Sequence, residues 1–255
     1  MDGLVAPLDK ICNLAEQYDA LVMIDECHAA GFLGDTGRGT LEAKGVLNRI
    51  DIITGTLGKA LGGGMGGYTT GKKEIISMGI DEIDPSTFTG EKITPKELHE
   101  KLNNNEDIIL LDTRNEYEVR LGTFEDAVDL NLDSFRDFPN KIMSLDQKMK
   151  NKEIVMFCTG GVRCEKASAL MLKNGFKNVK QIDGGVIKYF EETGGAYWNG
   201  DCFVFDDRVA LDKNLNETDY ILCFRCREPL NKKEIDSDKY KIDEYCPYCF
   251  DEVFS

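Results

Sequence analysis

Apolar residues in the first 78 positions of this 255-residue chain fall into short runs that alternate with an amphipathic segment. This spacing predicts one helix followed by strands, as in an α/β unit. The elements are expected at LDKICNLAEQYD (8–19), ALVMID (20–25) and DIITGT (51–56), followed by the glycine-rich segment KALGGGMGGYTTG (59–71).

A second alternating pattern occupies residues 93–195 and predicts a compact α/β domain. Its first helix is expected to begin at Thr94–Pro95, because a threonine N-cap followed by proline is a typical helix start. The later elements are expected as strands at 107–113, 153–158 and 178–183 and as helices at 164–175 and 185–194.

The segments on either side of this domain have a different composition. Residues 79–92 (GIDEIDPSTFTGEK) are polar, acidic and rich in turn formers, which is typical of a linker. Residues 200–255 contain too few apolar residues for an independent core, so this tail is expected to need a covalent or metal staple. No apolar run is long enough to span a membrane, and charged residues near the start exclude a signal peptide. We therefore expect a cytoplasmic protein.

Nine cysteines without a secretory signal favour metal binding or catalysis over disulfides. Four of them have the spacing C-x2-C-x19-C-x2-C, in which each pair aims two sulfurs at one point. This predicts a closed, structural zinc site, with iron in a rubredoxin-like site as the alternative. The predicted ligands are Cys223, Cys226, Cys246 and Cys249.

The stretch VMFCTGGVRCEKAS (155–168) predicts a strand, a glycine-containing loop and a helix. Cys158 ends the strand, where backbone N–H groups at the start of the helix can surround its sulfur. Such an arrangement lowers the pKa of a thiol and makes it a nucleophile, and Arg163 adds positive charge. Gly160 and Gly161 allow the backbone to approach the sulfur closely.

Four residues separate Cys158 from Arg163, one fewer than in the loop of tyrosine phosphatases. A tighter loop suits a single extra sulfur atom on the cysteine better than a phosphoryl group. The length of the loop therefore favours persulfide chemistry.

Three motifs in residues 93–195 resemble those of a rhodanese domain: LLDTRNEYE (110–118), CTGGVRC (158–164) and IDGGVIKY (182–189). LGTFEDAV (121–128), FRDFP (135–139), WNGDCFVFDDRVA (198–210) and the cysteine-rich tail are similar to the rhodanese-containing tRNA uridine hydroxylases, which install a 5-hydroxyl on wobble uridine. The resemblance covers residues 79–255. It implies a parallel sheet flanked by helices and a small zinc-ribbon-like tail.

The same resemblance assigns roles around the loop. It implies that Cys158 is the persulfide-forming catalytic cysteine, supported electrostatically by Arg163 and the loop amides. Asp112 and Arg114 would hold the loop from the neighbouring strand. Cys164 is either a resolving thiol or a structural residue. The loop residues in question are Thr159, Gly160, Gly161, Val162 and Cys164.

The net charge of −15 bears on the expected partners, because it repels polyanions on average. A tRNA substrate therefore requires a local basic patch or a segment absent from this chain. A sulfur donor or a sulfur carrier is the other expected partner.

Residues 1–78 resemble a different family. LVMIDECHAAGFLGDTGRGT (21–40) and DIITGTLGKALGGGMGGYTT (51–70) are similar to the central part of glycine C-acetyltransferase (2-amino-3-ketobutyrate CoA ligase), an enzyme of pyridoxal phosphate fold type I. The resemblance implies that Asp25 pairs with the pyridinium nitrogen and His28 contacts the phenolic oxygen. It also implies that Lys59 forms the Schiff base and Thr56 touches the phosphate.

The N-terminal segment contains only a fragment of that family, without the ring-stacking residue, the phosphate loop or the C-terminal domain. A junction near Met78 is compatible with a gene fusion, a decayed locus or an assembly or gene-model error. Three hypotheses follow for the whole chain: a rhodanese-type tRNA uridine hydroxylase, a pyridoxal phosphate-dependent acyltransferase, and a non-catalytic chimeric rhodanese and zinc binding module.

Overall fold

The computed structural model describes residues 4–60, 62, 66–71, 78–80 and 83–254. The chain divides into two compact units, Met1–Ile76 and Ser77–Ser255. Residues 61 and 63–65 of the predicted glycine-rich segment lie outside the described residues. In the described part of the chain, no helix is both long and apolar enough to cross a bilayer.

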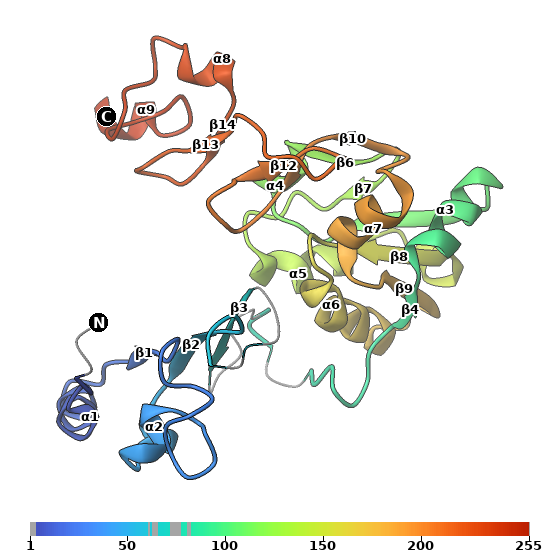
Figure 1. Ribbon diagram of the computed structural model, residues 1–255. Coiled ribbons are helices and arrows are strands. Elements are labelled where there is room, and N and C mark those ends of the chain that lie inside the picture. Colours follow the sequence, from blue (N-terminus) through green and yellow to red (C-terminus); the bar gives the residue numbers. More distant parts are fainter. Residues whose placement is uncertain (1–3, 61, 63–65, 72–77, 81–82, 255) are drawn as a thin grey trace. The chain divides into compact units, whose positions relative to one another are not determined.

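The first unit contains a three-stranded sheet in the order β1-β2-β3 (Figure 1). Strands β1 and β2 are parallel, and β3 is antiparallel to β2. The predicted helix and first two strands are confirmed, whereas β3 falls in the glycine-rich segment, for which no strand was predicted. Its elements are α1 (Leu8–Gln17), β1 (Met23–Asp25), α2 (Thr40–Ala43), the 3-10 helix η1 (Leu47–Arg49), β2 (Ile52–Thr56) and β3 (Gly67–Gly71).

A small apolar core holds this unit together. Leu8 and Cys12 of α1 pack with Val22, Leu41 and Ile50. Burial of these side chains, at about 25 cal/mol per Å² of apolar surface, fixes the helix against the sheet.

The second unit is built on a five-stranded parallel sheet in the order β4-β9-β8-β5-β7. The predicted strands at 107–113, 153–158 and 178–183 are confirmed and form its three central members. The sheet consists of β4 (Glu91–Ile93), β5 (Ile108–Asp112), β7 (Val128–Asp129), β8 (Glu153–Phe157) and β9 (Asn178–Ile182).

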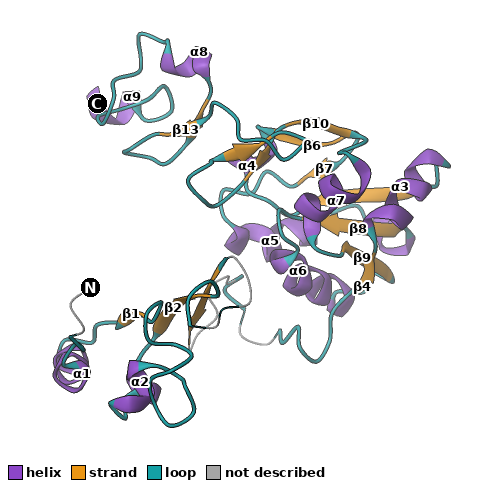
Figure 2. Ribbon diagram, in the orientation of Figure 1, coloured by secondary structure: helices purple, strands orange, loops and turns teal. Residues whose placement is uncertain are grey.

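Helices cover both faces of this sheet (Figures 1 and 2). On one face α3 and α7 lie side by side, and their Leu98, Tyr189 and Phe190 pack on Val155 and Phe157. Helix α6 packs on β8 and β9 and contacts α5. The bounds are α3 (Pro95–Asn103), α4 (Glu116–Val119), η2 (Phe135–Asp137), α5 (Phe138–Met143), η3 (Gln147–Asn151), α6 (Val162–Lys173) and α7 (Gly185–Thr193).

The start of α3 confirms the predicted helix signal. Thr94 accepts a hydrogen bond from the Glu97 amide, and the Glu97 carboxylate accepts one from the Thr94 amide. This reciprocal capping satisfies two donors at the helix start that would otherwise lack partners.

The sheet begins earlier than the composition indicates. Glu91 and Lys92, inside the segment expected to be a linker, pair with β9. Just before them, the Gly90 amide donates to the Ser168 hydroxyl, and Thr89 donates to the Glu165 carbonyl oxygen. The end of the predicted linker therefore belongs to the α/β domain, and Thr89, one of the polar residues that suggested a linker, is held in it by a side-chain hydrogen bond.

Short two-stranded ladders and short helices follow α7. Strand β10 pairs with β6, which precedes the sheet strand β7, so the chain returns to the domain after residue 195. The later ladders are local hairpins. The bounds are β6 (Gly122–Phe124), β10 (Trp198–Gly200), β11 (Cys202–Phe203), β12 (Ala210–Leu211), β13 (Ile221–Leu222), β14 (Pro229–Leu230), α8 (Lys232–Ile235) and α9 (Phe250–Phe254).

Candidate active site and metal centre

The reactive cysteine loop lies between β8 and α6. Cys158 directly follows β8, and α6 begins at Val162, two residues earlier than predicted. Consequently Arg163 and Cys164 belong to the first turn of the helix. The Gly161 amide nitrogen lies 3.1 Å from the Cys158 sulfur and donates to it. The amides of Arg163 and Cys164 also lower the pKa of this thiol, so three backbone N–H groups at the helix start act on the sulfur.

These contacts change the acidity of Cys158. A hydrogen bond from the Cys164 thiol, the nearby Arg163 and the helix amides outweigh burial and lower the pKa of Cys158 to about 6. Conversely, burial and the neighbouring Cys158 raise the pKa of Cys164 well above its usual value. The loop therefore holds Cys158 as the thiolate and Cys164 as the thiol at neutral pH.

The start of α7 fixes the other side of the loop. The Val186 amide donates to the Cys158 carbonyl oxygen at 3.0 Å, and the Ile187 amide donates to the Thr159 carbonyl oxygen at 3.2 Å. A Cβ atom at Gly185 would lie 2.5 Å from the Cys158 carbonyl oxygen. Only glycine permits this approach. The second glycine of the IDGGVIKY motif therefore supports the active-site loop.

Arg163 is held by a residue that sequence reasoning missed. Both oxygens of the Glu118 carboxylate accept from its guanidinium, at 2.6 and 2.7 Å. Glu118 is fully buried. Burial of an ion pair is tolerated only when it is well paired, and this two-point geometry fixes the position of Arg163. In the sequence, only its place in the LLDTRNEYE motif pointed to Glu118. Its role was missed because its partner, Arg163, lies 45 residues further along the chain.

The rim of the loop is more open than its floor. Val162 is 57% exposed, and Gly160 is exposed as well, whereas Cys158 is only 2% exposed. Thr159 donates to the Phe203 carbonyl oxygen at 3.2 Å, which links the loop to β11. The predicted loop residues are thus brought together around one sulfur, with the exposed backbone between Thr159 and Val162 as their outer face.

Asp112 and Arg114 are placed differently from the prediction. They form a fully buried ion pair with each other, with Arg114 Nη2 2.7 Å from Asp112 Oδ2. Their other side-chain hydrogen bonds go to the carbonyl oxygens of Gly122 and Glu118 and to the Thr123 hydroxyl. They therefore anchor β6 beside β5. Thr113, between them, is the residue that reaches the loop, because its hydroxyl donates to the Phe157 carbonyl oxygen and lies 3.5 Å from the Cys164 sulfur.

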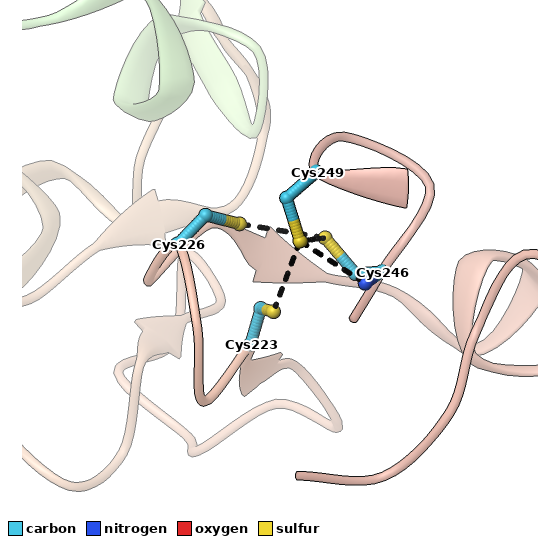
Figure 3. Close-up of side chains that lie close together, drawn as sticks. All are labelled: Cys223, Cys226, Cys246 and Cys249. Atoms are coloured by element: carbon cyan, nitrogen blue, oxygen red, sulfur yellow. Dashed lines mark hydrogen bonds between the residues drawn. The ribbon is translucent and has the colours of Figure 1, made fainter. Parts of the chain in front are cut away.

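The four tail cysteines come together as the spacing predicts (Figure 3). Their sulfur atoms all lie within 4.8 Å of one another and could hold a metal ion. Cys223 precedes β14 in the β13–β14 hairpin, and Cys246 and Cys249 flank a turn before α9. Leu230 is the buried apolar side chain that accompanies three of these cysteines in the described core of the tail.

The predicted cofactor residues of the first unit are also close together. Lys59 Nζ lies 3.1 Å from His28 Nε2, and Asp25 accepts from the Cys27 amide at 2.7 Å. The hydrogen bond from the Cys27 amide is the main cause that lowers the pKa of Asp25, and the positive charge of Lys59 lowers it further. Thr56 donates to the Gly66 carbonyl oxygen.

Asp25, His28 and Lys59 are all exposed. A pyridoxal ring needs side chains that enclose it. The described residues of this unit do not enclose these three side chains, so we assign no cofactor chemistry to it.

Residues 94–192 match the family model of the rhodanese-like domain. Four of the five strands of the parallel sheet and the loop after its central strand lie in the matched stretch, and β4 comes just before it. Residues 94–192 are a rhodanese-like domain. The rhodanese-like domain makes up most of the second unit.

A curated relative extends this similarity beyond the rhodanese-like domain. The tRNA uridine(34) hydroxylase of Teredinibacter turnerae is 45% identical over 183 residues, which is 71% of this chain. The chain covers 57% of that relative's length.

Solved structures match parts of the chain. A serine palmitoyltransferase from S. paucimobilis is 37% identical, with 29% of this chain and 18% of that chain covered and a TM-score of 0.27. The serine palmitoyltransferase of Sphingomonas wittichii is 35% identical, with 28% and 18% covered and a TM-score of 0.27. A rhodanese-related protein from Thermoplasma volcanium is 20% identical, with 40% and 93% covered and a TM-score of 0.33.

The low pKa of Cys158 predicts a characteristic pH profile. The thiolate reacts, so the alkylation rate of Cys158 should fall about tenfold per pH unit below pH 6 and level off above it. Cys27 provides an internal control, because its hydrogen bond to Asp25 raises its pKa, and its rate should still rise at pH 9. Peptide mass spectrometry after brief iodoacetamide treatment measures both rates. Parallel profiles for the two cysteines would contradict the loop geometry.

The exposure of Lys59 leads to a second prediction. Because the described residues around it leave a cofactor ring open to water, pyridoxal phosphate should produce no visible absorbance that depends on Lys59. Absorbance spectra of the wild-type chain, Lys59→Ala and the control Lys44→Ala test this. A visible band that disappears in Lys59→Ala and persists in Lys44→Ala would show a working cofactor site.

Proposed function

We propose that this chain is a rhodanese-type enzyme of the tRNA uridine hydroxylase class that uses a persulfide on Cys158. The observation that carries the proposal is the convergence of three backbone amides and Arg163 on the Cys158 sulfur. The 45% identity to a tRNA uridine(34) hydroxylase supports the choice of substrate class. The assignment covers residues 93–195 as the catalytic domain and residues 200–255 as a metal-binding tail, with residues 1–78 as a separate fragment.

The chemistry begins with the Cys158 thiolate, which attacks the outer sulfur of a donor such as thiosulfate. A bond forms between Cys158 Sγ and that sulfur, the sulfur–sulfur bond of the donor breaks, and sulfite leaves with the bonding electrons. The product is a Cys158 persulfide. The amides of Gly161, Arg163 and Cys164 face the sulfur and stabilise negative charge there.

Arg163 contributes positive charge without leaving its place. Its guanidinium is buried and bonded at two points to Glu118, so it offers a fixed field to the persulfide. Thr159 also reaches Glu118, at 3.4 Å, and ties the loop to the same carboxylate. Cys158, Arg163 and the loop amides are thus preorganised before the donor arrives.

We assign zinc to the four tail cysteines. A Zn–S bond of about 2.3 Å places the thiolates of a tetrahedral site about 3.8 Å apart. The sulfur pairs Cys223–Cys249 and Cys226–Cys246 are 3.9 and 3.5 Å apart, which fits this edge length. Four thiolates leave no open position, so zinc would supply folding energy to the zinc-ribbon-like tail and take no part in the reaction.

The proposed substrate is the wobble uridine of tRNA in the cytoplasm. The substrate should be tested first, because the chain is acidic and covers 57% of the curated relative's length. Expression of the chain in a bacterium that lacks its own uridine hydroxylase should restore 5-hydroxyuridine in its tRNA. Nucleoside mass spectrometry measures the product. Absence of 5-hydroxyuridine, together with normal persulfide formation, would reduce the proposal to a sulfurtransferase without tRNA activity.

A further inference from the structure

Cys164 lies in the active-site loop but has no part in forming the persulfide. It is the third residue of α6 and is completely buried. Its thiol and its backbone amide both act on the Cys158 sulfur and lower the pKa of that thiol. The side chain and the backbone of one residue therefore both reach the reactive sulfur.

A second contact keeps the Cys164 sulfur at this position. It lies 3.5 Å from the Thr113 hydroxyl oxygen. That hydroxyl donates at 2.9 Å to the carbonyl oxygen of Phe157, the residue immediately before Cys158. Thr113 thus connects the Cys164 sulfur to the strand end that carries Cys158, and all of these groups are buried.

Another buried cysteine of the domain provides a comparison. Cys202 is also completely buried, but its sulfur donates to the carbonyl oxygen of the adjacent residue Phe203. Cys202 packs in the apolar cluster with Phe124 and Trp198, as a small apolar side chain does. Cys164 instead directs its thiol at the one sulfur that is held as a nucleophile.

We propose that Cys164 is the resolving thiol of Cys158: it attacks Cys158 Sγ whenever that sulfur carries a leaving group, and closes a Cys158–Cys164 disulfide. The reaction that starts from a Cys158 persulfide rests on the proposed function. Cys164 Sγ bonds to Cys158 Sγ, and the bond between Cys158 Sγ and the outer sulfur breaks. The outer sulfur leaves with the electron pair as sulfide and takes the proton from Cys164.

The electrons of this step balance within the site. Cys158 and Cys164 end as a disulfide, and the outer sulfur is reduced to hydrogen sulfide. A dithiol reductant then returns both cysteines to thiols for the next cycle. A hydroperoxide provides the equivalent reaction without sulfur: it oxidises Cys158 to the sulfenic acid, and attack by Cys164 gives the same disulfide and water.

The test uses the full-length metal-loaded chain, reduced and then freed of reductant. Thiosulfate is added to the wild type, Cys164→Ser, Cys164→Ala and the control Cys202→Ser, and released sulfide and intact mass are followed. In the wild type and Cys202→Ser we expect a burst of sulfide and a disulfide peptide joining Cys158 to Cys164. In both Cys164 variants we expect loss of the burst and a lasting Cys158 persulfide. A parallel sample of each protein receives hydrogen peroxide in place of thiosulfate.

Each result has a defined meaning. A wild-type persulfide as long-lived as that of Cys164→Ser, or a disulfide from Cys158 to Cys202, would overturn the proposal. A Cys158–Cys164 disulfide after peroxide, with no sulfur transfer from thiosulfate to any protein, would support the resolving role and contradict the proposed sulfur chemistry. Because the wild-type peptide map alone detects the disulfide, the test stands even if a Cys164 variant fails to fold.

Discussion

After brief thiosulfate treatment the Cys158→Ser chain is expected to carry no sulfane sulfur, whereas the wild-type chain should carry it on Cys158 until Cys164 displaces it as sulfide. A serine hydroxyl is not ionised at neutral pH, even among the three amides that lower the pKa of the thiol. The loss should therefore be complete. Intact mass spectrometry, with peptide mapping to place the sulfur, measures the outcome in samples analysed before reduction.

The matched control for this prediction is Cys202→Ser. Cys202 is buried, and burial raises the pKa of its thiol to about 12, so it should remain an unreactive thiol at neutral pH. Sulfur on Cys158 in the Cys202→Ser chain, and none in the Cys158→Ser chain, is the expected pair of results. Equal sulfur content in all three chains would place the reactive group elsewhere and refute the role of the loop.

The loop itself could be predicted from the sequence because its determinants are local. Strand, glycines, arginine and helix follow one another within the stretch 155–168, and each has its own backbone preference. Glu118 could not be assigned in the same way. Its role as the partner of Arg163 depends on the distance between two side chains 45 residues apart, which the order of residues does not specify.

The contacts of Asp112 and Arg114 also depend on residues that come together only in the folded chain. Their motif indicated a scaffold, but only the packing of β6 beside β5 shows that they hold Gly122 and Thr123. Thr113, which reaches the loop, carried no separate signal in the sequence.

Short strands were predicted less well than long ones. The ladders formed by β11 and β12 and by β13 and β14 involve two residues per strand, too few to show an alternating pattern. β3 begins and ends with glycine, which favours a turn in isolation. It is a strand because its backbone pairs with β2 over five residues. Tertiary pairing thus decides the elements whose local signals are weak.

The tail depends on its four cysteines for a core, so removal of the metal should unfold it. Structural zinc sites contribute about 10 kcal/mol or more to folding, far more than burial of Leu230 can supply. Chelation, or the substitution Cys246→Ser, should make residues 212–254 sensitive to protease. Limited proteolysis with mass spectrometry and a measurement of bound metal check this. Cys27→Ser, which changes a cysteine outside the cluster, should match the wild type in both measurements.

The effect on catalysis distinguishes a structural metal from a catalytic one. The tail is attached to the rhodanese-like domain through Arg120, which lies 2.7 Å from Glu228 and stacks 4.0 Å from the Tyr248 ring centre. Arg120 follows α4, but the pair formed by Glu118 and Arg163 is buried. The C-terminal residues that contact the loop and this pair, Phe203 and Phe205, precede residues 212–254. We therefore expect the chelated protein to lose the tail fold and still form a Cys158 persulfide. Loss of the persulfide at the same chelator concentration that exposes the tail would instead show that the metal-bound tail maintains the active-site loop.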